Sequence, residues 1–132
     1  MAVLDASVIL QIPFEEEFTR KARLLVKEAD SIEAPHILWY EVGNGIVKLH
    51  RRKLIDEHGA VESLGRLMQI PIRLVETDIP RTLGLALELQ ITFYDAAYVD
   101  AALQLGTELY TADNLLYERA LRRIEAKHIG RI

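Results

Sequence analysis

Four acidic residues, far apart in the sequence, stand where a carboxylate could hold a cation. Asp5 and Asp113 each follow a short apolar run typical of a buried strand, whereas Glu41 and Asp95 fall in segments with helical periodicity. Carboxylates and waters supply the hard oxygen ligands that Mg²⁺ and Mn²⁺ prefer. A site with one or two such ions can orient a water, lower its pKa and neutralise charge that develops on a phosphate. If the four side chains converge, they are suited to metal-dependent hydrolysis of a phosphodiester.

Each of these acids also has a simpler structural explanation. Asp5 and Asp113 could be the N-caps of the helices that follow them, because a carboxylate accepts hydrogen bonds from the free N–H groups of a first helical turn. Thr92 and Asp95 have the spacing of a capping box, and the helix dipole favours a negative charge in that turn. Glu41 lies on a largely apolar helix face, where its burial needs a cation or a donor, but it could equally lie at the solvated edge of that face.

The sequence offers no obvious protein nucleophile. It contains no cysteine, no Gly-x-Ser-x-Gly elbow and no glycine-rich phosphate loop ending in Lys-Ser or Lys-Thr. The four histidines are scattered and none falls in the short motifs around the acids described below, so catalysis by a histidine pair is not favoured. These absences favour a water nucleophile.

The composition is that of an ordinary globular protein. The 132 residues suffice for one domain spanning 1–132, with 50% apolar and 27% charged residues and no cysteine for disulfides or thiolate metal sites. No apolar run approaches the roughly 20 residues that a membrane span needs, and Asp5 interrupts the apolar run at the N-terminus. We therefore expect a cytoplasmic protein with no membrane partner.

The net charge of −4 does not exclude a nucleic-acid partner, because the basic residues are clustered. Lys48, Arg51 and Arg52 follow Glu41 in the same predicted helix, and Arg119 lies in the last one. Flanking phosphates need such cations, so these four residues are candidates for substrate binding. A solvated basic face or a contact with a protein partner would explain them equally well.

The expected elements alternate between strands and helices. Apolar patterning and turn residues predict strands at 2–4, 31–34, 72–76, 107–111 and 128–132, and helices at 14–29, 36–51, 56–69, 77–90, 94–105 and 114–123. This alternation predicts an α/β sandwich around a parallel sheet. Ligands of such sheets collect beyond the carboxyl ends of the strands, which is where Asp5 and Asp113 fall.

Four short motifs in this order resemble the PIN domain, the nuclease fold of the VapC toxins of toxin–antitoxin pairs. The motifs are Val3-Leu4-Asp5-Ala6-Ser7, Tyr40-Glu41-Val42-Gly43-Asn44, Tyr94-Asp95-Ala96-Ala97-Tyr98-Val99 and Leu109-Tyr110-Thr111-Ala112-Asp113. The resemblance covers essentially the whole chain in length and in element order. It implies a three-layer α/β sandwich with a five-stranded parallel sheet in the order 3-2-1-4-5, flanked by helices.

The resemblance also implies a function. The acidic positions of the family fall on Asp5, Glu41, Asp95 and Asp113, as catalytic residues and ligands of Mg²⁺ or Mn²⁺, with Ser7 and Thr111 as a polar pair beside them. The implied activity is endoribonuclease cleavage of RNA, such as tRNA or rRNA, by a homodimeric toxin with a cognate VapB-type antitoxin. Asp100 lies outside this pattern. It follows Asp95 by five residues, about 500° around a helix, so we expect it to point elsewhere and to be solvated.

The main alternative is a PIN-like module that binds RNA or protein without cutting, although the presence of all four acids argues against it. A haloacid-dehalogenase phosphotransferase needs a second Asp where Ser7 stands. A receiver domain needs an acidic pair near the first strand and a Lys near the fifth, and neither is present.

Overall fold

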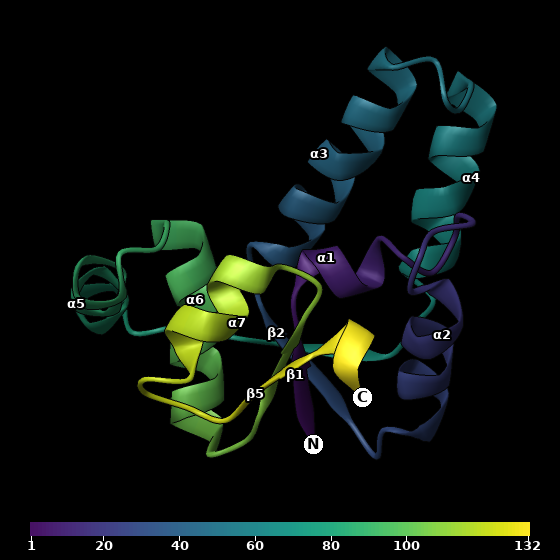
Figure 1. Ribbon diagram of the computed structural model, residues 1–132. Helices are drawn as coiled ribbons and strands as arrows, with labels where there is room; N and C mark the ends of the chain where they lie inside the picture. The colour runs from purple at the N-terminus through teal and green to yellow at the C-terminus, as the bar shows by residue number, and fades with distance from the viewer.

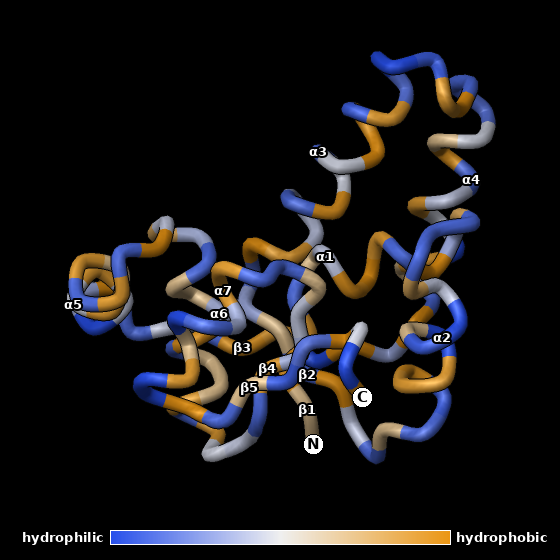
Figure 2. The backbone as a smooth tube through the Cα atoms, viewed as in Figure 1, coloured by the Kyte–Doolittle hydropathy of each residue, from blue (hydrophilic) through white to orange (hydrophobic).

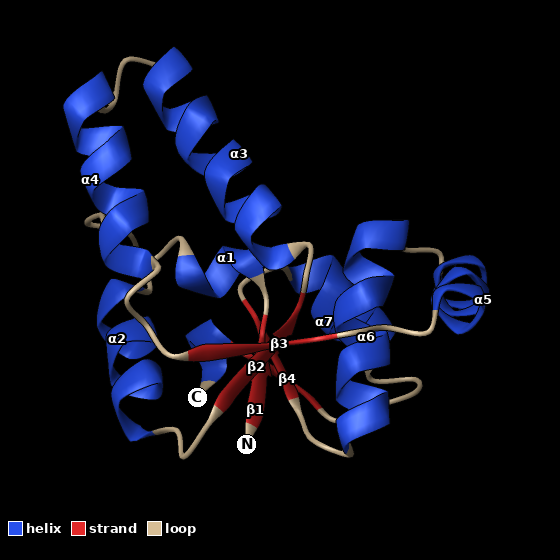
Figure 3. Ribbon diagram, turned by 180° about the vertical axis from the view of Figure 1, so that it is seen from behind, coloured by secondary structure: helices blue, strands red, loops and turns tan.

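The computed structural model describes residues 1–132 and has a five-stranded sheet at its centre. The strands are β1 (Ala2–Leu4), β2 (Ile32–Pro35), β3 (Ile72–Val75), β4 (Leu109–Thr111) and β5 (Ala126–His128). Their order is β3-β2-β1-β4-β5 and every pairing is parallel, as predicted. Figure 3 shows the strands as a fan with helices on both sides. The central position of β1 places its carboxyl end beside that of β4.

Seven α-helices and one 3-10 helix surround the sheet. They are α1 (Ala6–Ile9), α2 (Thr19–Glu28), α3 (Leu38–Arg51), α4 (Glu57–Leu67), α5 (Ile79–Leu89), α6 (Phe93–Leu105), α7 (Asn114–Ala120) and η1 (Ile129–Arg131). The pair α3 and α4 projects from the body, whereas α5 packs against α6 at the opposite side (Figure 1). None of the helices is both long and apolar enough to cross a lipid bilayer.

Helix α6 lies at the centre of the fold. Its residues from Ala96 to Ala102 are all buried, and several of them are alanines, which let the helix approach the sheet closely. A helix that is apolar all round is typically a core helix. Gly106, in the left-handed conformation at φ +64°, ends it.

The projecting helices are amphipathic. Figure 2 shows hydrophobic and hydrophilic residues alternating along α3 and α4. Leu38, Val42 and Ile46, which recur every four residues, form the buried stripe of α3. This stripe fixes the rotation of α3 about its axis and therefore the direction of its other faces.

Two predicted boundaries were wrong. The helix expected at 14–29 begins only at Thr19, because local side-chain bonds hold the preceding loop: the Thr19 hydroxyl donates to the Phe14 carbonyl, and the Gln11 amide oxygen accepts the Phe18 N–H. The last strand was expected at 128–132. It instead ends at His128 and gives way to η1, where the His128 ring accepts the Gly130 N–H.

Candidate active site

The four acidic residues line one cavity of about 380 Å³ at the carboxyl ends of β1 and β4. They come from four parts of the chain: Asp5 follows β1, Glu41 lies in the first turn of α3, Asp95 lies in the first turn of α6, and Asp113 precedes α7. Figure 1 shows α1, α3 and α7 meeting around this end of the sheet. The order of the strands thus collects carboxylates that are more than a hundred residues apart.

Asp5 is the most buried of the four acids, with an exposed fraction of 5%. Its Oδ1 accepts from the Ser7 hydroxyl at 2.5 Å and from the Val8 N–H at 3.2 Å, and its Oδ2 accepts from the Thr111 hydroxyl at 2.5 Å. Burial raises the pKa of Asp5 from 3.8 to about 7, although the Ser7 and Thr111 hydroxyls oppose the rise.

Ser7 and Thr111 form the polar pair that connects the two central strands. Their hydroxyl oxygens lie 3.3 Å apart. The Ser7 oxygen also accepts the Ala112 N–H at 2.8 Å, and the Thr111 oxygen accepts the Asp113 N–H at 3.0 Å. Both side chains therefore hold the loop after β4 against the end of β1, and with it the backbone of Asp113.

Asp95 is half-buried and lies among like charges. Burial, followed by the negative charges of Glu41 and Asp113, raises its pKa from 3.8 to about 6. The repulsion indicates that the three carboxylates are close enough to interact. The Thr92 hydroxyl accepts the Asp95 N–H at 3.0 Å, so Thr92 is the N-cap of α6, while the Asp95 carboxylate faces the cavity.

Asp5 and Asp113 are both helix N-caps, as the simpler explanation predicted, and this does not remove them from the candidate site. Asp5 caps α1 through the Val8 N–H, and Asp113 Oδ1 caps α7 through the Leu116 N–H at 2.8 Å. Both residues line the cavity as well. A cap fixes the carboxylate at the end of a strand, which is the position a ligand-binding side chain needs here.

The Glu41 carboxylate has a single hydrogen-bonding partner, the buried hydroxyl of Tyr98, which donates to Glu41 Oε1 at 2.7 Å. Packing of α3 against α1 sets the height of Glu41 over the sheet. Gly45, one turn after Glu41, permits this packing, because a Cβ there would lie 2.5 Å from a methyl carbon of Leu10.

The chemistry of this site fits a hard divalent cation. Four carboxylates, the hydroxyls of Ser7 and Tyr98 and the amide of Asn44 supply oxygen atoms to its lining, and Lys48 is the one cation there. Two of the carboxylates have pKa values raised by burial, which a cation would relieve. No three acidic or histidine side chains are close enough to hold one ion together. Mg²⁺ is usually bound by one or two carboxylates and keeps several waters, so such a cluster is not required.

The candidate substrate-binding residues separate into two groups. Lys48 lines the cavity, two turns after Glu41. Arg51 and Arg52 lie at the exposed end of α3 and do not line it. Arg119 is directed elsewhere: its guanidinium donates to the carbonyls of Leu89 at 3.1 Å and of Gln90 at 2.7 Å, and so ties α7 to the end of α5.

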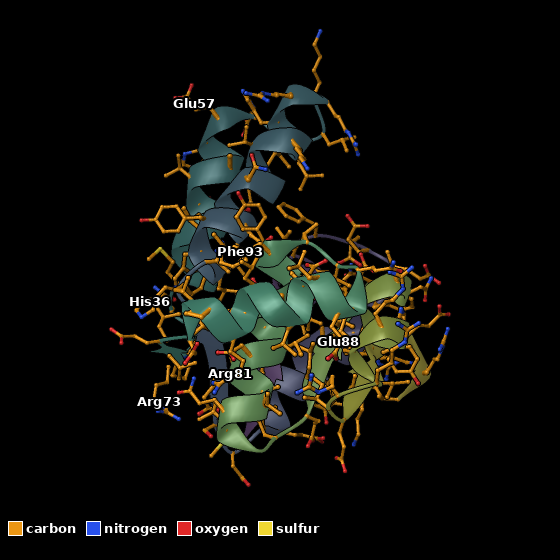
Figure 4. All side chains as sticks on the ribbon, turned by 90° about the vertical axis from the view of Figure 1, so that its left-hand side faces the viewer. His36, Glu57, Arg73, Arg81, Glu88 and Phe93 are labelled. Atoms are coloured by element: carbon orange, nitrogen blue, oxygen red, sulfur yellow. The ribbon has the colours of Figure 1, made fainter.

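The expectation that Asp100 is solvated was wrong. Its side chain is fully buried, and it accepts from Arg81 Nε at 2.5 Å and from the Asp78 N–H at 2.9 Å. Figure 4 shows Arg81 at the side of the molecule where α5 crosses α6. The angle around the helix correctly separates Asp100 from Asp95. Because α6 is buried all round, however, the opposite direction leads to α5 and not to solvent.

Tyr98 is the residue of the site that the sequence analysis missed. It belongs to one of the four motifs but was given no role. A signal was available, since Tyr98 follows Asp95 by three residues and must share its helix face.

Comparison with known proteins agrees with this fold. The PIN domain family matches the chain over residues 2–121. Ribonuclease VapC3 of Pyrobaculum aerophilum is 32% identical over an alignment of 121 residues, and the alignment covers 89% of this chain and 92% of that protein. The crystal structure of PAE2754 from the same organism superposes with a TM-score of 0.77 and 24% identity, covering 98% of this chain and 89% of that one.

A second solved structure is similar in fold at lower identity. It is VapC20 of Mycobacterium tuberculosis, described as a Sarcin-Ricin loop cleaving toxin, with a TM-score of 0.68 and 14% identity over 94% of this chain and 96% of that one. The family match spans most of the chain, and the curated relative exceeds 30% identity over almost its full length. This chain therefore belongs to the PIN domain family.

Proposed function

We propose that this protein is a Mg²⁺- or Mn²⁺-dependent endoribonuclease that acts as the toxin of a VapBC-type pair. The observation that carries the proposal is the single cavity lined by Asp5, Glu41, Asp95 and Asp113. The name of the Pyrobaculum relative, a ribonuclease, supports the substrate class. VapC20 is described as cleaving the Sarcin-Ricin loop, and this supports a structured RNA such as rRNA or tRNA as the target.

The carboxylates would hold the cation, which supplies the polarisation of water and the neutralisation of phosphate charge. Asp5 is positioned for this by the Ser7 and Thr111 hydroxyls, and Asp113 by its cap on α7. Asp5 and Asp95 are partly protonated near neutral pH because burial raises their pKa values. Binding of a cation displaces those protons. Lys48 would hold a phosphate of the RNA at the rim of the cavity.

The proposal is tested by incubating end-labelled tRNA and rRNA fragments with the purified protein in Mg²⁺, in Mn²⁺ and in EDTA. We expect cleavage at internal positions that requires the metal and that disappears in Asp95→Asn. The control variant is Glu88→Gln, which removes an exposed ion pair with Arg123 outside the cavity and should cleave normally. Cleavage in EDTA, or cleavage by Asp95→Asn at the wild-type rate, would contradict the proposal.

The second candidate is a PIN-like module that binds RNA or protein without cutting. It predicts that RNA is retained on the protein but stays intact in both metals. Filter binding of the same labelled fragments separates the two functions, because an endoribonuclease binds and then shortens its substrate. The full set of acids in the cavity favours the endoribonuclease.

We propose that the protein is a homodimer formed through α5 and the start of α6. Ile79, Leu83 and Leu87 form an exposed apolar stripe on α5. Exposed Phe93 and Tyr94 continue it, and a mostly apolar cavity of about 220 Å³ lies between them and Ile79. Figure 4 shows this face with Phe93 above α5.

An exposed apolar face of this kind is typical of an interface. Sedimentation velocity tests the proposal. Leu83→Glu is expected to sediment as a monomer. Met68→Glu is expected to sediment as a dimer, because Met68 is exposed to a similar extent at the end of α4, on the opposite side of the molecule from α5 (Figure 1). Monomeric wild-type protein would contradict the dimer without affecting the proposed activity.

We propose that this protein is cytoplasmic and that its second partner is a cognate VapB-type antitoxin, in keeping with VapC20, which is described as a toxin. Co-expression of the product of an adjacent gene with a tagged copy of this chain tests it. A stable co-purified complex that no longer cleaves RNA is expected. An adjacent product that neither binds nor inhibits would contradict the assignment to a toxin–antitoxin pair.

A further inference from the structure

We infer that Tyr98 is a positioning residue for Glu41, whose carboxylate it holds in the orientation that binds the cation. The inference rests on the proposed function, since it assumes that Glu41 is a ligand. Tyr98 lies on α6 and Glu41 on α3, 57 residues apart, and the phenol donates to Glu41 Oε1 at 2.7 Å. Both residues line the acidic cavity.

Tyr98 lies between the two halves of the site. Its side chain is 1% exposed, so the surrounding core fixes the position of the hydroxyl. The oxygen of the phenol is near the Ala6 N–H, at the start of α1, and near the negative charge of Asp5. From this position a single hydroxyl can set the distance between the carboxylate on α3 and the carboxylate at the end of β1.

The phenol is a permanent donor. A phenol ordinarily titrates near 10, and burial, followed by the charge of Glu41, raises the pKa of Tyr98 above that, so the hydroxyl is protonated near neutral pH. A carboxylate or a histidine in its place would change charge within the working range. A protonated phenol instead donates to Glu41 without adding a charge to the site.

The hydrogen bond fixes the direction in which the Glu41 carboxylate points. Glu41 is repelled by Asp95, since each negative charge disfavours the other. Without a donor, the Glu41 side chain would be free to turn away toward solvent, because the residue is only half-buried. With Oε1 held by Tyr98, Oε2 remains free of protein partners and available to a cation or a bound water.

The experiment is a calorimetric titration of Mn²⁺ into wild-type protein and Tyr98→Phe, which loses only the hydroxyl. The matched control is Tyr110→Phe, because Tyr110 is also a buried tyrosine that donates to a glutamate, Glu108 Oε1 at 3.1 Å, but it does not line the cavity. We expect Tyr98→Phe to weaken Mn²⁺ binding about tenfold, which corresponds to about 1.4 kcal/mol. Tyr110→Phe is expected to bind as the wild type does.

A double-mutant cycle asks whether the effect passes through Glu41. In the Glu41→Gln background the acceptor is no longer a charged ligand, so Tyr98→Phe should cause no further loss of Mn²⁺ affinity. A merely structural role would weaken binding equally in both backgrounds, and that result would overturn the inference. Unchanged Mn²⁺ affinity in Tyr98→Phe would overturn it as well.

Two other outcomes are a wild-type protein that binds no Mn²⁺ and a Tyr98→Phe variant that does not fold. If wild-type protein binds no Mn²⁺, the proposed function fails and the inference fails with it. If the wild type binds Mn²⁺ and Tyr98→Phe does not fold, the wild-type hydroxyl proton of Tyr98 is followed by NMR during a Mg²⁺ titration. A shift that saturates with the Mg²⁺ affinity supports the inference, and a resonance that does not move overturns it.

Discussion

The hydroxyl of Thr111 donates to Asp5 Oδ2 at 2.5 Å, although the two residues are 106 positions apart. This bond joins the carboxyl ends of β4 and β1, the two strands between which the cavity opens. Both groups are buried, so the bond is not exchanged with water. The geometry of the candidate active site thus depends on a contact inside the sheet.

Thr111→Val tests the contribution of this hydroxyl to stability, because valine keeps the shape of threonine but removes both the donor to Asp5 and the acceptor of the Asp113 N–H. We expect a loss of about 1–3 kcal/mol in the free energy of unfolding at pH 7.5, since Asp5 Oδ2 is left unsatisfied in the core. Urea unfolding measures it. Thr107→Val is the control, as its exposed hydroxyl bonds only the Met1 carbonyl. If both variants lose the same free energy of unfolding, the buried bond contributes no more to stability than the exposed one.

Stability without metal should fall as the pH rises from about 4 to 7. The folded pKa of Asp5, about 7, lies above its ordinary value of 3.8, so in this window the folded state binds more protons than the unfolded state. The contribution of Asp5 over the window is about 4 kcal/mol at most. Asp95, with a pKa of about 6, adds a change of the same sign.

The measurement compares wild type with Asp5→Asn in EDTA, because the asparagine does not titrate. The stability of the wild type relative to Asp5→Asn should decrease from pH 4 to pH 7 and become constant above it. Saturating Mn²⁺ should reverse this trend, since metal affinity rises as the ligands lose their protons. Parallel pH profiles for the two proteins would mean that Asp5 is not destabilised by burial.

The two roles of Asp113 can be separated by substitution. Asparagine caps helices about as well as aspartate, whereas alanine does not. Asp113→Asn should therefore keep the stability of the metal-free fold, and Asp113→Ala should lose about 1 kcal/mol through the Leu116 N–H. Both should lose Mn²⁺ affinity. If Asp113→Ala binds Mn²⁺ normally, Asp113 caps α7 but is not a ligand of the metal.

Asp100 should matter for stability and not for metal binding. Asp100→Asn removes the charge that Arg81 Nε and the Asp78 N–H share, in a fully buried position. We expect a loss of about 1–3 kcal/mol in the free energy of unfolding, because the buried carboxylate is a better acceptor for both donors than an amide, whereas Arg81 is 42% exposed and can be solvated. Calorimetric Mn²⁺ affinity of the folded variant should equal that of the wild type. A selective loss of Mn²⁺ affinity would assign Asp100 to the site.

Lys48 and Arg119 should differ in their effect on RNA binding. Lys48→Ala removes a cation at the cavity and should weaken binding, lowering the slope of log K against log salt by about 0.7 for a single-stranded substrate. Arg119→Ala should leave the slope unchanged, because the guanidinium is occupied by the carbonyls of Leu89 and Gln90. Fluorescence anisotropy with cleavage-blocked RNA measures both. Equal slopes in all three proteins would remove Lys48 from the binding surface.

The alternation of buried strands with helices predicted a parallel sheet, and the order of its strands was predictable because the sequence resembles a family of known topology. Local chemistry defined the ends of several helices in advance, such as the cap at Thr92 and Gly106 after α6. The start of α2 was not predictable from periodicity. It depends on Thr19 and Gln11 side chains that bond to the backbone of the preceding loop.

Periodicity also does not predict which charged side chains are buried. Asp100 was expected to be solvated but is buried, and Glu33, for which no prediction was made, is buried as well. Asp100 is paired with Arg81, but Glu33 Oε1 has no partner and its Oε2 lies 3.6 Å from exposed Arg73 Nε. Whether a charged position on a helix or strand reaches solvent depends on which element packs over it, and this is information that periodicity does not contain.

Anomalous diffraction from crystals grown with MnCl₂ tests most directly whether the four carboxylates form one metal site. We expect a manganese peak in the cavity, with carboxylate oxygens of this set at about 2.0–2.3 Å and waters completing the shell. The peak should be lost in crystals of Asp95→Asn. A manganese ion bound elsewhere, with none among Asp5, Glu41, Asp95 and Asp113, would contradict the account.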